Sequence, residues 1–294
     1  MWPLLLLALV PEPNVILITW DGVRREDFAD AKRLPRFWSK RAAGGLIIGG
    51  PAGPAMEVAD PALISLPAYQ SIFVGALTGC DSNDCGRVRP ETFPERLIRE
   101  LSLPRASVAV FASWKKIADA VEHASGTIAI DAGPDGAGAL PAWDDARRDA
   151  DTFALALRYL ATQRPRFLYL SLDDSDEWAH RGDLERYRAT LLQYDEWLDA
   201  LLDRIDSMGD YGKRTTVIVT TDHGRGNGAR WTGHGKSDPE AKSIWLFARG
   251  PGVKPGVPHS PATHLDLRPT IESLLGLCSQ RTPIPEVAPL ACRP

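Results

Sequence analysis

Asp222, His223 and His234 are the residues of this sequence whose types and spacing best suit metal chemistry. Asp222-His223-Gly224 ends a run of β-branched residues that begins at Thr215, and His234 follows ten residues after Gly224. Carboxylates and imidazoles are the ligands that Zn²⁺ takes in hydrolytic sites. A short apolar run that ends in such residues is typical of a buried parallel strand with a site at its carboxyl end. The competing interpretation is a polar strand end followed by a loop that contains a histidine by chance.

Two further apolar runs also lead to acidic residues. Residues 14–19 lead to Asp21, and residues 167–172 lead into an acidic stretch that contains Asp176. His180 lies four residues after Asp176, so a helical turn would put both side chains on one face, in reach of one metal ion. Two plainer interpretations compete: Asp21 as the N-cap of a following helix, and Asp176 with His180 in a solvated loop.

Ser65 is a candidate nucleophile because of its place before a helix. Ser65-Leu66-Pro67 is followed by helix formers, which puts Ser65 near an N-cap and Pro67 in the first turn. A capping role would explain the serine on its own. A hydroxyl at a helix start also lies where backbone N–H groups and the helix dipole favour an anion, so it is equally well placed to attack a phosphate ester.

The elements that must position these residues alternate between strand and helix patterns. The expected strands are 14–19, 107–113, 167–172, 215–221 and 243–248, with a short strand at 127–130 inside a loop. The expected helices are 35–43, 114–124, 142–161, 184–206 and 264–275. This alternation predicts a three-layer α/β/α sandwich with a mostly parallel central sheet, although it does not reveal the strand order.

Length and composition suit one large catalytic domain. The chain has 294 residues, of which 44% are hydrophobic and 24% charged, and we expect a single domain over residues 14–277. Residues 1–13 are interpreted as a short or trimmed signal segment and residues 278–294 as a Pro-rich tail. The net charge of −4 argues against a nucleic-acid scaffold, and no segment has the apolar length of a membrane span.

Four cysteines favour an oxidising compartment. Cys80 and Cys85 lie close together in a polar loop, and Cys278 and Cys292 bracket the Pro-rich tail. Two local disulfides would staple these loops, which predicts a periplasmic or secreted protein. The alternative is a cytoplasmic enzyme with four unpaired thiols.

Taken together, the motifs around Asp21, Ser65, Asp176 and Asp222 resemble the metal-dependent alkaline phosphatase superfamily, particularly its phosphodiesterase and nucleotide pyrophosphatase branch. The resemblance runs from Asn14 to about Leu277 and includes the closing Asp266-Leu267-Arg268-Pro269-Thr270-Ile271 helix. It implies two divalent metal ions, with Zn²⁺ expected and Mn²⁺ as the alternative. One ion would be held by Asp176, His180 and His234. The other would be held by Asp21, Asp222 and His223, with the Ser65 hydroxyl as a further ligand.

The same resemblance implies hydrolysis of a small-molecule phosphate ester through a phosphoserine at Ser65, with Asn83 as a candidate donor to the phosphate. Three departures leave the choice between monoester and diester open. The nucleophile is Ser65 where the pyrophosphatase branch mostly has Thr. Ala68 stands where that branch has Asn, and Pro67 stands where alkaline phosphatases have a phosphate-binding Arg.

Two rival functions remain open. Ser65-Leu66-Pro67-Ala68 partly matches the Ser-x-Pro-x-Arg signal of sulfatases, but the fifth position is Tyr69. Sulfatases of this superfamily bind one calcium ion mainly through oxygen ligands, so the nitrogen-containing second set favours a phosphohydrolase. The other rival is a secreted, non-catalytic binding protein with the same fold. Surface or capping roles are expected for the remaining histidines, which are His123, His259 and His264. Core or rim packing is expected for four aromatic residues, which are Tyr69, Trp114, Trp178 and Trp231.

Overall fold

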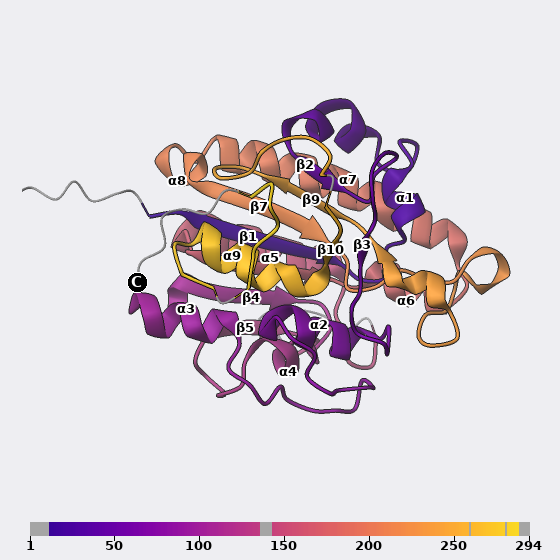
Figure 1. The fold of residues 1–294 in the computed structure, drawn as a ribbon, viewed down its shortest axis with the longest axis horizontal. Coiled ribbons are helices and arrows are strands. Elements are labelled where there is room, and N and C mark those ends of the chain that lie inside the picture. The colour runs from indigo at the N-terminus through magenta and orange to yellow at the C-terminus, as the bar shows by residue number, and fades with distance from the viewer. Residues whose placement is uncertain (1–11, 136–142, 259, 280, 288–294) are drawn as a thin grey trace, which may run out of the picture.

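A mostly parallel sheet of seven strands forms the centre of the computed structural model, which describes residues 12–135, 143–258, 260–279 and 281–287 (Figure 1). The strand order is β2-β9-β7-β1-β6-β4-β5, and neighbouring strands from β7 to β5 are parallel. The strands are β1 (Asn14–Trp20), β2 (Leu46–Ile48), β4 (Val108–Ala112), β5 (Ala129–Ala132), β6 (Phe167–Leu172), β7 (Thr215–Thr220) and β9 (Leu246–Arg249).

Helices cover both faces of this sheet, which confirms the three-layer α/β/α prediction. In β1, Val15 and Leu17 face one apolar core, whereas Ile16 and Ile18 face the other. The first core is closed by α2 (Ser65–Val74), α3 (Phe93–Leu101), α4 (Ile117–Val121) and α9 (Leu267–Leu274). The second is closed by α1 (Arg25–Ala29), α5 (Asp149–Gln163), α6 (Asp174–His180), α7 (Leu184–Asp206) and α8 (Asp210–Lys213).

Strand register brings Asp21, Asp173 and Asp222 together at the carboxyl ends of three adjacent strands. β1 lies between β7 and β6, with Thr19 opposite Thr220 and Trp20 opposite Leu172. The next residues along the three strands are therefore level with one another, and the Asp21 N–H still donates to the Leu172 carbonyl at 2.9 Å. The carboxyl ends of three adjacent parallel strands thus deliver acidic residues to a single place, as open α/β sheets do at their binding sites.

The prediction of one strand at 243–248 is wrong in one respect. This segment forms two strands, which belong to different sheets. β8 (Ser243–Ile244) joins β3 (Met56–Glu57) and β10 (Ala262–Thr263) in a small sheet, whereas β9 pairs antiparallel with β7. Trp245, between them, is fully buried in the second core. An unbroken apolar run does not reveal that its two halves pair with different partners.

Two predicted helices are shorter than expected. The predicted helix at 114–124 is limited to α4, and the one predicted from residue 142 begins only at Asp149. In place of helix, the Lys115 N–H donates to the Asp145 carbonyl and the Arg147 N–H to the Ser113 carbonyl. These long-range bonds join the two segments to each other, and the short strand expected near 127–130 is β5, at one edge of the main sheet.

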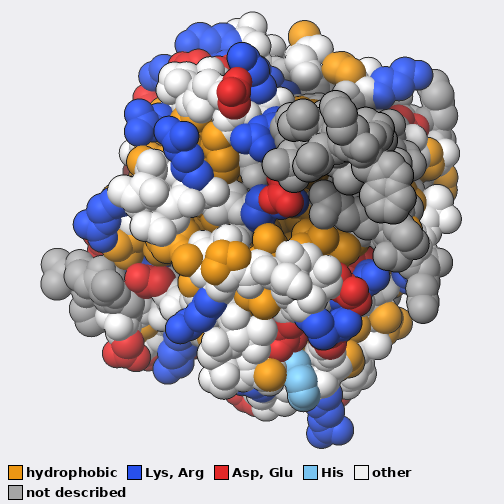
Figure 2. Space-filling model, turned by 90° about the vertical axis from the view of Figure 1, so that its left-hand side faces the viewer, with side chains coloured by type: hydrophobic (Ala, Val, Ile, Leu, Met, Phe, Trp, Pro, Cys, Tyr) orange, Lys and Arg blue, Asp and Glu red, His pale blue; other side chains and the backbone are white. Residues whose placement is uncertain are grey.

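Figure 2 shows the side of the molecule at which the parallel strands begin, opposite the side at which they end. Basic, acidic and apolar side chains are intermixed over the part of this face that the described residues form. Among the described residues, no helix combines the length and the apolar character that a membrane span requires.

Cys80 and Cys85 form the predicted disulfide. The expected pairing of Cys278 with Cys292 involves a residue outside the described part of the chain.

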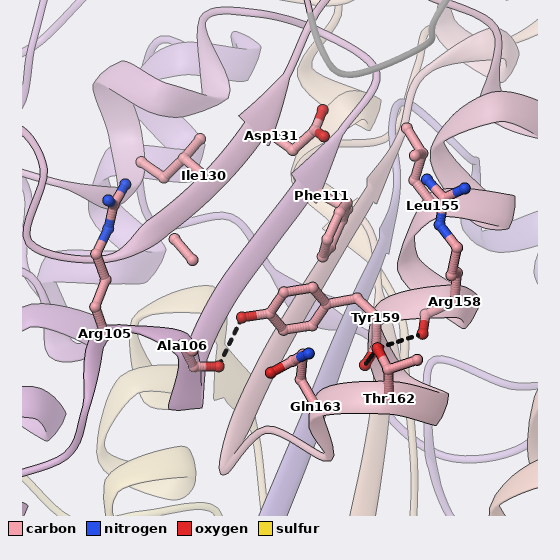
Figure 3. Close-up of a pocket in the computed structure, with 11 residues that line it drawn as sticks. Arg105, Ala106, Phe111, Ile130, Asp131, Leu155, Arg158, Tyr159, Thr162 and Gln163 are labelled. Carbon is pink, nitrogen blue, oxygen red and sulfur yellow. Dashed lines mark hydrogen bonds between the residues drawn. The ribbon is translucent and has the colours of Figure 1, made fainter.

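A cavity of about 700 Å³ lies between α5, β4 and β5 (Figure 3). Phe111, Leu155 and Tyr159 give it an apolar lining, and the Tyr159 hydroxyl donates to the Ala106 carbonyl at 2.7 Å. None of the site residues predicted from the sequence lines this cavity. The candidate chemistry therefore lies elsewhere, at the carboxyl ends of the strands.

Candidate metal centre and nucleophile

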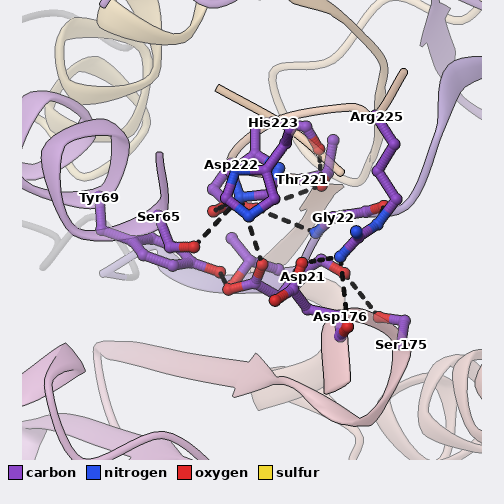
Figure 4. Close-up of polar contacts among 12 residues, drawn as sticks. Asp21, Gly22, Ser65, Tyr69, Ser175, Asp176, Thr221, Asp222, His223 and Arg225 are labelled. Carbon is purple, nitrogen blue, oxygen red and sulfur yellow. Dashed lines mark hydrogen bonds and ion pairs between the residues drawn. The ribbon is translucent and has the colours of Figure 1, made fainter. Parts of the chain in front are cut away.

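Asp21, Asp222 and His223 form a buried cluster at the ends of β1 and β7, here called the buried set (Figure 4). One potential ligand atom from each residue lies within 4.8 Å of the others. His223 Nε2 is 3.2 Å from Asp222 Oδ2 and 3.7 Å from Asp21 Oδ1. The three side chains are almost fully excluded from solvent.

Hydrogen bonding defines the protonation of His223. Its Nδ1 lies 2.9 Å from the Gly224 carbonyl, which can only accept, so Nδ1 carries the hydrogen and Nε2 presents a lone pair. Burial lowers the pKa of this imidazole to about 3, so it is neutral at pH 7. Asp21 Oδ1 and Asp222 Oδ2 receive no hydrogen bond from any described residue. Two carboxylate oxygens without a hydrogen bond and an imidazole nitrogen, facing one another in a buried site, fit a divalent cation.

The carboxylates of the buried set repel one another without such a cation. Burial raises the pKa of Asp222 to about 6, although the Gly22 N–H donates to its Oδ1 at 3.1 Å. Burial, together with the charge of Asp222, raises the pKa of Asp21 well above its ordinary value. A bound cation would favour the charged forms of Asp21 and Asp222 and so lower both pKa values.

Asp176, His180 and His234 form a second cluster, here called the open set. Helix α6 carries Asp176 and His180 one turn apart, and His180 Nε2 lies 3.0 Å from Asp176 Oδ2 and 3.1 Å from His234 Nε2. The His234 Nδ1–H donates to the Leu63 carbonyl at 2.9 Å, which turns Nε2 inward as a lone-pair donor. Burial lowers the pKa of both imidazoles, that of His234 to about 2. A carboxylate and two neutral imidazoles suit zinc.

The two sets are adjacent. The rings of His223 and His234 stack with centroids 3.9 Å apart. Asp176, His223 and His234 also have potential ligand atoms within 4.8 Å of one another. The structure therefore brings the six predicted carboxylate and imidazole ligands into one continuous site.

Ser65 lies beside the buried set, but it is not the N-cap of α2. Ile64 occupies the cap position in an extended conformation, and Ser65 is the first helical residue. This frees the Ser65 hydroxyl from backbone capping, and Oγ lies 3.1 Å from His223 Nε2. The competing interpretation, in which capping alone explains this serine, is therefore wrong, because Asn83 supplies the acceptor instead. Asn83 Oδ1 accepts the Leu66 N–H at 3.0 Å.

Asn83 reaches this helix from the Cys80–Cys85 loop. Its carbonyl oxygen is engaged with the helix start, so only its amide N–H groups remain for the donor role predicted from the sequence. The Lys116 ammonium donates to the Asn83 backbone carbonyl at 2.7 Å and secures the loop from the other side.

Tyr69 belongs to the site, although its sequence context predicts packing alone. Its hydroxyl donates to Asp21 Oδ2 at 2.9 Å. Tyr69 follows Ser65 by four residues, so both lie on one face of α2. That spacing is the signal that could have identified it.

Arg225 and Asp173 are also part of the site, and sequence reasoning missed them. Arg225 is 2% exposed and its Nη2 contacts Asp176 Oδ1. Asp173 is buried with Asp21 and Asp176, and burial together with the charge of Asp149 raises its pKa well above the ordinary value. A basic residue in a glycine-rich loop carries no sequence signal that its side chain turns inward.

The other histidines divide between surface and core. His123 is exposed, and its Nδ1 lies 3.2 Å from the Val88 carbonyl. The surface or capping role expected for His264 is wrong. This residue is fully buried and its Nδ1 accepts the Ala59 N–H at 2.9 Å, because the chain from β10 into α9 packs against α2. His259 lies outside the described residues.

Comparison with known proteins shows similarity to sulfatases and phosphate-ester enzymes. Residues 114–277, more than half of the chain, match the Sulfatase family. The chain is also similar to a phosphopentomutase of Symbiobacterium thermophilum, at 29% identity over 133 residues. That alignment covers 45% of this chain and only 31% of the mutase, so the chain spans about a third of the length of this relative.

Several solved structures share the fold. A 2-O GAG sulfatase matches with a TM-score of 0.62 and 16% identity, over 94% of this chain and 73% of that one. A protein of the alkaline phosphatase superfamily from Vibrio parahaemolyticus matches with a TM-score of 0.64 and 13% identity, over 90% of this chain and 66% of that one. At these identities the likeness shows a common fold and leaves the reaction to be argued from the site.

Proposed function

Since this chain belongs to the sulfatase family, within the alkaline phosphatase superfamily, we propose that it is a metal-dependent hydrolase of phosphate esters with Ser65 as its nucleophile. The substrate is a small-molecule phosphate monoester or diester, and the site takes two divalent ions, most suitably Zn²⁺.

The observation that carries this proposal is the open set beside the buried set. Two neutral imidazoles and one carboxylate, with atoms 3.0 and 3.1 Å from His180 Nε2, make a nitrogen-rich site that suits Zn²⁺. Asp21, Asp222 and His223 provide a second set next to it. Two adjacent cation sites flanking a hydroxyl are the arrangement that in-line transfer of a phosphoryl group requires.

Ser65 contributes the attacking oxygen. When bound, the two ions supply positive charge that lowers the pKa of a nearby hydroxyl and stabilises the leaving oxygen. Ser65 Oγ loses its proton and forms a bond to phosphorus while the bond from phosphorus to the leaving oxygen breaks, and that oxygen takes up a proton from solvent to leave as the alcohol. Water then cleaves the bond between Ser65 Oγ and phosphorus, which restores the hydroxyl and releases phosphate from a monoester or a phosphate monoester from a diester.

The surrounding chain orients these groups. Ser65 is the first residue of α2, where the positive end of the helix dipole favours the oxygens of a phosphoryl group. Asn83 fixes the first turn through Leu66, and Tyr69 holds Asp21 from the same helix. Hydrogen bonds from helix α2 therefore link Ser65 to the Cys80–Cys85 loop and to Asp21 of the buried set.

A sulfate-ester hydrolase is the second candidate. The family match and the solved sulfatases favour it, as does the partial Ser-x-Pro-x-Arg pattern at Ser65. The contact of Tyr69 argues against it. The residue that stands in place of the Arg of that pattern is buried and donates its hydroxyl to Asp21.

One assay panel separates these candidates. Metal-loaded protein is given an aryl phosphomonoester, an aryl phosphodiester and an aryl sulfate, with and without a chelator. We expect turnover of at least one phosphate ester with Zn²⁺ or Mn²⁺, and its loss in the chelator. Dominant sulfate cleavage, with neither phosphate ester turned over, would establish the sulfatase instead. Tight metal binding without turnover of any ester would favour the non-catalytic alternative.

We also propose a periplasmic or secreted location, which the Cys80–Cys85 disulfide supports. Thiol titration of protein purified without reductant tests it. Two reactive thiols from this loop in freshly prepared native protein would contradict it.

A further inference from the structure

Arg225 joins three parts of the site from a buried position. Its Nε–H donates to the Gly22 carbonyl at 3.1 Å and its Nη1–H to the Thr232 carbonyl at 2.8 Å. Its Nη2 contacts both the backbone carbonyl and the Oδ1 atom of Asp176 (Figure 4). The end of β1, helix α6 and the loop before His234 are thereby fixed relative to one another.

The two oxygens of Asp176 consequently have different partners. Oδ1 faces the Arg225 guanidinium, whereas Oδ2 lies 3.0 Å from His180 Nε2 and points into the open set. A carboxylate whose second oxygen is engaged by a guanidinium offers a cation one oxygen rather than two.

Gly22 makes this close approach possible. A Cβ atom at residue 22 would lie 2.6 Å from Asp176 Oδ1 and 2.7 Å from Arg225 Nη2, and the backbone φ of +62° also disfavours a side chain there. The ion pair between Arg225 and Asp176 therefore depends on a glycine from a different strand end.

We infer that Arg225 sets the metal preference of the open set by keeping Asp176 a one-oxygen ligand. This inference deepens the proposed function and rests on its assignment of the open set to a metal. One carboxylate oxygen and two imidazoles match the four-coordinate preference of Zn²⁺ with one position left open. Larger ions that prefer oxygen, such as Mn²⁺ and Ca²⁺, gain from a second carboxylate oxygen, which Arg225 withholds.

Two substitutions break the contact in different ways. Arg225→Met removes the guanidinium and keeps a long side chain, and Gly22→Ala keeps Arg225 but forces it away from Asp176. Arg230→Met is the matched control, because Arg230 belongs to the same loop but its side chain is 57% exposed and pairs with Asp238 and Glu240. The Kd values for Zn²⁺ and Mn²⁺ are measured for each protein by competition with a chromophoric chelator, and melting temperatures of the metal-free forms are recorded.

The ratio of the two Kd values is the decisive quantity. We expect the preference for Zn²⁺ over Mn²⁺ to fall by about tenfold or more in both site variants, within the 10- to 100-fold range typical of residues that orient metal ligands. The Arg230→Met ratio should equal that of the wild type. Equal loss of affinity for both ions, or an unchanged ratio in either folded variant, would mean that Arg225 only supports the fold. Because the ratio is read from binding, wild-type protein that binds zinc but cleaves no ester would overturn the proposed function alone.

Discussion

The buried set and the open set contain similar ligands but are held in different ways. Asp21, Asp222 and His223 are at most 2% exposed and follow two central strands, whose register fixes their positions. In the open set the side chain of His180 is 47% exposed, and the three residues come from helix α6 and a loop. Contacts from Arg225 and from the Leu63 carbonyl orient two of them.

This difference assigns different tasks to the two sets. Burial keeps the pKa values of both carboxyl groups of the buried set raised, with the charge of Asp222 adding to the shift of Asp21, until a cation binds. The open set is reached by solvent at His180, whose side chain is 47% exposed. We therefore expect the buried set to activate Ser65 and the open set to exchange its ion and admit the ester.

The largest expected effect comes from the hydroxyl beside the buried set. Ser65→Ala should lower kcat by about 10³-fold or more while leaving metal binding nearly unchanged, because six other side chains supply the ligands. Ser71→Ala, on the same helix, is the control, since its hydroxyl donates to Asp60 at 3.1 Å and lies outside the site. Full activity in Ser65→Ala would show that the buried set does not activate this serine.

Removing a ligand from the open set should separate the two sets. His180→Ala should leave about one tightly bound ion per chain and lower activity by about 10- to 100-fold, because the open set loses a third of its protein ligands. Metal content after dialysis measures this. Loss of both ions at once would mean that the two sets bind cooperatively and that the comparison fails.

A smaller effect is expected at the tyrosine that holds the buried set. Tyr69→Phe removes the hydrogen bond to Asp21 Oδ2 and should lower the free energy of unfolding by about 1–3 kcal/mol. Urea unfolding measures that loss, and activity should fall with it. Tyr159→Phe, which removes a bond to the Ala106 carbonyl near the cavity of Figure 3, should lower stability without affecting activity. Equal activity in the two variants would contradict a role of Tyr69 in the site.

The smallest effect concerns pH. A carboxyl group whose pKa is higher in the folded state contributes stability at low pH, and this contribution is lost as pH rises through the folded pKa. For Asp222 that pKa is about 6, whereas the buried imidazoles of His223 and His234, with pKa values lowered to about 3 and about 2, add stability as pH rises over the same range, so the contribution of Asp222 is measured against Asp222→Asn. The melting temperature of the chelated wild type, relative to that of chelated Asp222→Asn, should fall by a few degrees as pH rises from about 5 to 7.

Zinc should remove this difference between the wild type and Asp222→Asn. A chelated wild type whose melting temperature, relative to that of Asp222→Asn, stays constant or rises from about pH 5 to 7 would show that the buried Asp222 carboxyl does not contribute to how stability changes with pH.

The residues that make up the candidate site could be predicted largely from local sequence. Three apolar runs that lead to acids, with histidines at spacings of four and about ten residues, identify the side chains that the structure brings together. Helix α7 and strand β6 have the predicted bounds, because a long amphipathic repeat and a short buried run each have one clear interpretation. These patterns depend only on neighbouring residues.

Tertiary structure decided the strand order, the division of residues 243–249 between two sheets, and the roles of Tyr69, Asn83 and Arg225. Strand order depends on which apolar faces meet after the chain has folded, and no local pattern encodes it. The sequence does not distinguish a buried arginine from an exposed one, because the role of the side chain depends on a carboxylate from a distant part of the chain. The contacts of Arg225 with Asp176 and Gly22, which lie 49 and 203 positions away in the chain, exist only once the parallel strands align.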